Sequence, residues 1–151
     1  MSHAHQATRS LDRMAFDATR HCLTGCAIGE VVGTAGSGLL SLSTGASLLA
    51  GIVLAFVFGY SLTFFPLLGT GMSLLRALGV TLAADTISIV VMESVDNLFV
   101  LLVPGAMAAG LGDPLFWASL VIGLVLAFVV AFPVNRWLVA RGRGHALAGH
   151  H

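Results

Sequence analysis

One short stretch of the sequence, "HCLTGCAIGEVVG" (residues 21–33), contains both cysteines of the chain together with a histidine and a glutamate. Residues four apart share one face of an α-helix. Cys22, Cys26 and Glu30 are therefore predicted to line one face, with His21 beside the first of them. Two thiolates one turn apart favour a soft metal ion, with Cu(I) preferred and Zn(II) as the harder competitor. The alternative is that both cysteines are small apolar residues in a packed interior.

A second stretch, "LAADTISIVVMESVDNLFV" (residues 82–100), contains three acids and no basic residue. Three such acids cannot all be ionised in hydrocarbon, so some must be protonated, hydrated or bound to a cation. Glu30, Asp85, Glu93 and Asp96 are therefore predicted to form a relay for protons or a cation, and Met92 is a candidate thioether ligand. The alternative is a structural network of protonated carboxyls, with Met92 as core packing.

The composition predicts that these side chains lie within a membrane. Hydrophobic residues make up 57% of the chain and charged residues 9%, whereas a soluble domain usually has about 25% charged residues. Four apolar segments reach about 20 residues, the length of a spanning helix, and spans exposed to lipid must be helices or closed barrels. The expected fold is an all-α membrane protein with four spans, at about residues 17–42, 47–68, 74–103 and 115–139.

The predicted organisation is a polar N-terminal tail (1–16), a four-helix transmembrane domain (17–141) and a short basic, histidine-containing C-terminal tail (142–151). No secretory signal peptide pattern is present in the first residues. All seven basic residues are arginines, and they fall before or at the start of the first span, at the start of the third, and at or just beyond the end of the fourth. The positive-inside rule then predicts that both termini are cytoplasmic.

A glycine row and a polar C-terminal end suggest contacts beyond the spans themselves. Gly25, Gly29 and Gly33 lie beside the thiol face, and small residues at this spacing let helices approach closely. Besides the lipid bilayer, the expected partner is therefore a second copy of the chain, a homodimer through this glycine face. The formal net charge is zero, so no nucleic-acid partner is expected. No organic cofactor is indicated.

Four segments carry a resemblance to a known family: "HCLTGCAIGEVVG", "MESVDNLFVLLVPGAMAAG", "DPLFWASL" and "PVNRWLVARGRGHA". Together they resemble the bacterial membrane family catalogued as domain of unknown function 4396, over nearly all the chain beyond the N-terminal tail. The resemblance implies a small multi-pass protein of the bacterial plasma membrane and no particular activity. It also singles out a set of signature positions: His21, Cys22, Cys26, Glu30, Met92, Glu93, Asn135, Arg136 and His145. The last three are predicted polar groups at the cytoplasmic end.

The leading functional hypothesis is a membrane protein that binds, and by extension transports, a soft transition-metal ion such as Cu(I). The ligands would be His21, Cys22, Cys26 and Met92. The first alternative is proton-linked transport of a small solute through the buried carboxylates, with the cysteines incidental. A structural or assembly subunit and a thiol redox enzyme are further alternatives. The sequence contains no Ser/His/Asp set, phosphate loop or HExxH pattern, so an enzyme is not expected.

Overall fold

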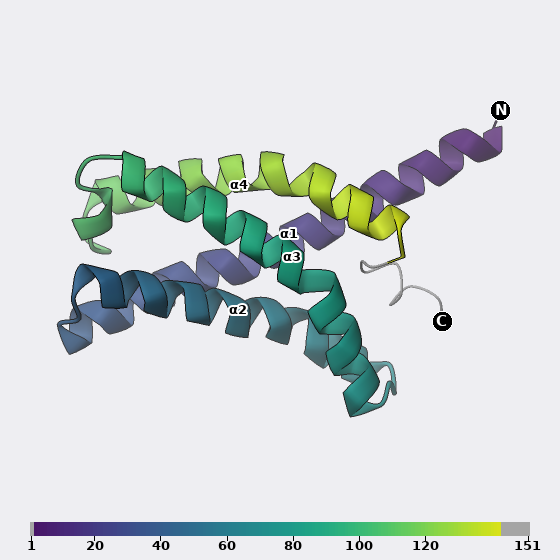
Figure 1. The fold of residues 1–151 in the computed structure, drawn as a ribbon, viewed down its shortest axis with the longest axis horizontal. Helices are drawn as coiled ribbons and strands as arrows, with labels where there is room; N and C mark the ends of the chain where they lie inside the picture. Colours follow the sequence, from purple (N-terminus) through teal and green to yellow (C-terminus); the bar gives the residue numbers. More distant parts are fainter. Residues whose placement is uncertain (1, 143–151) are drawn as a thin grey trace.

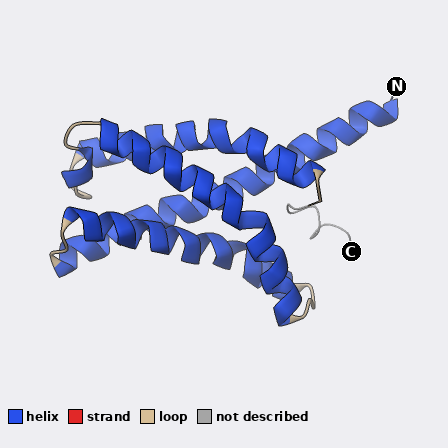
Figure 2. Ribbon diagram, in the orientation of Figure 1, coloured by secondary structure: helices blue, strands red, loops and turns tan. Residues whose placement is uncertain are grey.

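The computed structural model describes the backbone of residues 2–142 and the side chains of residues 5–142. This part of the chain consists of helices and loops, without strands (Figure 1 and Figure 2). Its elements are α1 (Ser2–Leu40), α2 (Thr44–Gly69), α3 (Leu74–Leu102), the short 3₁₀ helix η1 (Ala106–Ala108) and α4 (Pro114–Ala140). The four long helices are each long and apolar enough to cross a membrane. The predicted all-α fold with four spans is confirmed.

The largest difference from the prediction is at the N-terminus, where the expected polar tail (1–16) is helical from Ser2 and continuous with the first span. Residues 2–16 contain no glycine or proline, and many of them favour helix. The span that follows supplies the costly first helical turns, so the helix extends outward without a new nucleus. Figure 1 shows this part of α1 projecting past the other helices. Of the predicted C-terminal tail (142–151), the described part includes only Gly142.

Helix starts are defined by local capping interactions. The side chain of Ser43 accepts a hydrogen bond from the Ala46 amide at the start of α2. At the start of α4, the Asp113 carboxylate accepts from the Leu115 amide at 2.8 Å, and Pro114 occupies the first turn. Both are preferred arrangements for the otherwise unpaired amides of a first turn. The capping residues thus fix where α2 and α4 begin.

The four helices form a bundle in which α1 packs against α2 and α4, and α3 packs against α4 and α2. In addition, α1 and α3 touch each other across the centre of the bundle. The α2–α3 turn and the described C-terminal end lie together at one end of the molecule (Figure 1). We call this the arginine end, because all the described arginines lie on the segments that meet there or project beyond it. The opposite end, with the α1–α2 and α3–α4 connections, is called the arginine-free end.

The surface of the bundle is apolar, whereas charged side chains lie inside it. Large hydrophobic side chains such as Leu49, Val53 and Val129 are exposed, while Asp85 and Asp96 are buried. This distribution is the one expected of a chain surrounded by lipid, where ionisable residues face the interior of the bundle. The interior of the bundle is therefore where functional groups are to be sought.

Glycines on α1 allow α2 to approach it closely. The contacts pair Gly25, Gly29 and Gly33 with Gly59, Ala55 and Gly51, respectively. A Cβ atom on Gly25 would lie 2.5 Å from the Gly59 Cα, far closer than real side chains approach backbone. The glycine row therefore lies against the backbone of α2 of the same chain. A homodimer through the glycine face, as expected from the sequence, would require a second copy to displace α2 from it.

Candidate functional site

Six side chains meet along the contact between α1 and α3, and we call this set the buried column. It consists of Cys22, Cys26 and Glu30 on α1, and Asp85, Glu93 and Asp96 on α3. Both helices run from the arginine end to the arginine-free end, so the side chains pair in chain order. The α1 members extend over eight residues, or about 12 Å at 1.5 Å per residue. The sequence predicted the two faces separately, and the structure shows that they lie against each other.

The first pair of the column is Cys22 and Asp85. The Cys22 Sγ donates a hydrogen bond to Asp85 Oδ1 at 3.6 Å, and both side chains are buried. The hydroxyl of Ser88, one turn along α3, also lies within hydrogen-bonding reach of the thiol. The Cys22 thiol thus acts here as a proton donor to a carboxylate from another helix.

The second pair is Cys26 and Glu93, whose side chains lie within hydrogen-bonding reach. Asn97, one turn further along α3, donates its amide hydrogens to the Glu93 Oε2 at 3.1 Å and to the Glu93 backbone oxygen at 2.7 Å. Glu93 is only 5% exposed, yet its Oε1 has no hydrogen-bond partner among the described residues. One oxygen of this carboxyl is therefore fixed by Asn97, and the other makes no hydrogen bond of standard geometry within the described residues.

The third pair is Glu30 and Asp96, whose carboxyl groups interact directly. Neither oxygen of Asp96 makes a hydrogen bond of standard geometry within the described residues, although the side chain is buried. Asp96 also lies against the backbone of α4, because a Cβ atom on Gly123 would overlap its Oδ1. Two neighbouring carboxyls cannot both carry a negative charge in such a place. The pair must share a proton or hold a cation.

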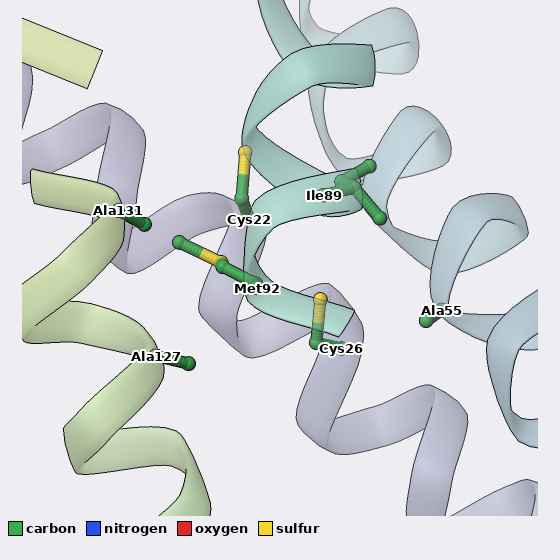
Figure 3. Close-up of a cluster of buried hydrophobic side chains, with 7 residues drawn as sticks. All are labelled: Cys22, Cys26, Ala55, Ile89, Met92, Ala127 and Ala131. Atoms are coloured by element: carbon green, nitrogen blue, oxygen red, sulfur yellow. The ribbon is translucent and has the colours of Figure 1, made fainter. Parts of the chain in front are cut away.

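Three sulfur-containing side chains gather in the middle of the bundle (Figure 3). Cys22 and Cys26 of α1 pack with Ile89 and Met92 of α3, surrounded by alanines of α2 and α4. Both cysteines are free thiols. His21, the fourth predicted metal ligand, is half-buried on the neighbouring face of α1. Within the described residues, no group of three or more His, Cys, Asp or Glu side chains has the arrangement of a metal site.

At the arginine end, a polar hub joins three helices. The amide of Asn135 on α4 donates to Thr19 Oγ1 on α1 at 2.9 Å and to Ser88 Oγ on α3 at 3.0 Å. Thr19 in turn donates to the Ala15 backbone oxygen at 2.7 Å. Because Ser88 also reaches Cys22, the hub continues directly into the buried column. Thr19 was not predicted, since a threonine in an apolar helix gives no signal until its partner on another helix is known.

The other predicted end groups have a structural explanation or lie outside the described residues. The Arg136 Nε donates to Asp12 Oδ1 at 2.5 Å, and the two side chains are partly exposed, at 42% and 47%. This ion pair attaches the projecting part of α1 to α4. His145 lies outside the described residues. Asn135 and Arg136, neighbours in sequence, therefore have different environments, one in the bundle interior and one at its surface.

At the arginine-free end, the column adjoins a cavity of about 80 Å³. Its polar lining comes from all four helices and consists of Glu30, Thr34, Thr44, Ser47, Glu93, Asn97 and Ser119. One water molecule needs roughly 10–15 Å³ of such volume, so the cavity has room for several. Glu30 and Glu93 belong both to the column and to the cavity wall, and they link the two.

The column, the hub and the cavity all lie within a segment of the chain that matches a known protein family. Residues 12–144 match the family described as "Domain of unknown function (DUF4396)", and the match includes the column, the hub and the cavity. The chain belongs to the DUF4396 family. The resemblance predicted from the sequence segments is thereby confirmed. No curated protein and no solved structure matches the chain, so the function has to be inferred from the site.

Proposed function

We propose that this DUF4396 protein carries out proton-linked transport across the bacterial plasma membrane, with the buried column as its proton path. The observation that carries the proposal is the succession of three pairs: Cys22 with Asp85, Cys26 with Glu93, and Glu30 with Asp96. Every pair contains a carboxyl group, which can accept and release a proton. Buried carboxyls in a membrane are costly and are the usual components of proton relays.

The two ends of the column support a directional path. At the arginine-free end it adjoins a cavity that is large enough for water. At the arginine end it reaches the Asn135 hub, whose hydrogen bonds to Thr19 and Ser88 are buried. In this proposal the hub and both termini face the cytoplasm, as the positive-inside rule predicts from the positions of the arginines. Protons would then enter the column from the outer side of the membrane and leave it past the hub.

Proton uptake into liposomes tests the proposal. Purified protein is reconstituted with a trapped pH-sensitive dye, and a potassium gradient with valinomycin drives protons inward. We expect uptake in the wild type and a loss of at least about tenfold in Asp96→Asn, which corresponds to a barrier raised by about 1.4 kcal/mol. Gly123→Ala should also lower uptake, because it keeps every titratable group but displaces the Asp96 carboxyl.

Two matched substitutions serve as controls. Asp17→Asn removes a carboxyl that is exposed on α1 and paired with Arg20 at the surface. Gly79→Ala adds a methyl group on α3 where no atom lies within 4 Å. Both should retain wild-type uptake. The proposal fails if the wild type takes up protons no faster than empty liposomes, or if Asp17→Asn and Asp96→Asn behave alike.

A second candidate function, binding of Cu(I), is supported by the cluster of Cys22, Cys26 and Met92. Thiolate and thioether sulfurs are the ligands that Cu(I) prefers. The thiols must lose their protons when a metal binds, and their carboxyl neighbours Asp85 and Glu93 are placed to accept them. Since the described residues contain no complete site of three His, Cys, Asp or Glu side chains, this candidate depends on Met92 as the third ligand.

Metal analysis of protein purified without oxygen tests this second candidate. Stoichiometric copper is expected in the wild type, with loss of copper in Cys22→Ser/Cys26→Ser and weaker retention in Met92→Leu. The thermal midpoint of each variant, measured in the same detergent, shows whether the bundle is intact. Equal copper content in the wild type and in the double variant would exclude the cluster as a copper site.

A further inference from the structure

We infer that the cavity at the arginine-free end is a binding site for Na⁺, the solute whose movement is coupled to protons. This inference rests on the proposed transport function and deepens it by naming the class of solute. The cavity lies between the four helices where Glu30 and Glu93 end the buried column. A cation bound there would be in direct contact with the groups that exchange protons.

The charge of the cavity selects a cation. Glu30 and Glu93 are both in its wall, and its described lining contains no basic residue. The chain has no lysine, and its described arginines lie on the segments that form the arginine end of the bundle or project beyond it. Glu93 is almost completely buried, and its Oε1 makes no hydrogen bond of standard geometry within the described residues. A negative oxygen in so apolar a place needs a proton or a bound cation.

The chemistry of the lining favours a hard cation over a soft one. The polar groups of the wall offer carboxylate, amide and hydroxyl oxygens, the ligand atoms that hard cations prefer. The two cysteines and Met92 lie in the separate cluster on the column side and are not in the wall. Met107 contributes one thioether to the wall, which is too little sulfur for a soft-metal site. The cavity and the sulfur cluster are therefore two distinct sites.

The number of available carboxylates favours a single positive charge. Glu30 already interacts with Asp96, which leaves Glu93 as the carboxylate with a free oxygen. Asn97 uses its amide nitrogen to hold Glu93, so its amide oxygen is left to act as a ligand. Divalent ions such as Ca²⁺ require six to eight oxygens with several carboxylates, and the described residues contain no such acidic group. A site with one available carboxylate and several neutral oxygen ligands matches the single positive charge of Na⁺.

The test is equilibrium binding of radioactive ²²Na⁺ to the purified full-length protein in detergent, by scintillation proximity. Saturable binding is expected in the wild type. Glu93→Gln should weaken it by at least about tenfold. Ser119→Ala, a milder change that removes one hydroxyl from the wall, should weaken it by a smaller factor. Asp17→Asn, far from the cavity on the surface of α1, should bind as the wild type does.

The outcomes separate this inference from the proposed function. Saturable binding that depends on Glu93 supports the site even if no proton uptake is seen in liposomes. Proton uptake without saturable Na⁺ binding overturns the site and leaves proton transport standing. Equal affinity in the wild type and in both cavity variants overturns it as well. Displacement studies add one further outcome: binding of methylammonium without binding of Na⁺ would assign the cavity to an organic amine and overturn the inference.

Discussion

Replacing Gly29 by alanine is expected to separate α1 from α2 and to destabilise the whole bundle. The added methyl group would overlap the backbone nitrogen and Cα of Ala55. Neither helix can yield locally, because backbone atoms and not a flexible side chain are in the way. Overpacking of this kind costs about 1–3 kcal/mol and occasionally more. The measurement is the thermal unfolding midpoint of the purified protein, followed by circular dichroism.

Gly36→Ala is the matched control, since it lies two turns further along α1 and a Cβ atom there meets nothing within 4 Å. Alanine is the better helix former by roughly 0.5–1 kcal/mol, so this variant should be as stable as the wild type or slightly more so. If the two variants unfold at the same temperature, the close α1–α2 contact does not support the bundle.

Asn135→Ala is expected to make the protein leaky to protons. The substitution removes the donor that joins Thr19 and Ser88, and with it the buried link between α1, α3 and α4. Water can then reach the arginine end of the buried column. Passive proton conductance in liposomes should rise roughly tenfold, equivalent to a barrier lowered by about 1.4 kcal/mol. The free energy of unfolding should change by less than this barrier does, since buried hydrogen bonds in membranes average about 0.6 kcal/mol each.

Arg136→Ala tests whether the leak is specific to the interior hub. Arg136 is the next residue of α4, but it pairs with Asp12 near the surface, where both side chains are partly exposed. Ion pairs of this kind contribute about 0–1 kcal/mol, and no leak is expected. If the proton conductance of Asn135→Ala is no higher than that of Arg136→Ala, the hub does not close the column.

The sequence by itself determined the number of spans and the composition of each helix face. For every span except the first, it also determined the boundaries to within a few residues. Apolar length and helical spacing are local properties, so Cys22, Cys26 and Glu30 could be assigned to one face without tertiary information. The glycine row beside them could likewise be identified as a close-packing face. The start of α1 was missed, because polarity was taken as a sign of a tail although the residues themselves favour helix.

The tertiary structure decided which faces meet. Helix propensity and hydrophobicity carry no information about neighbours, so the sequence could not show that Cys22 contacts Asp85 over a separation of 63 residues. It also could not show that the glycines pack against α2 of the same chain instead of a second copy. The Asn135 hub depends on hydroxyls from two other helices. The cavity exists only because all four helices contribute to its wall. Contacts between distant segments depend on how the helices pack, and packing is a property of the whole bundle.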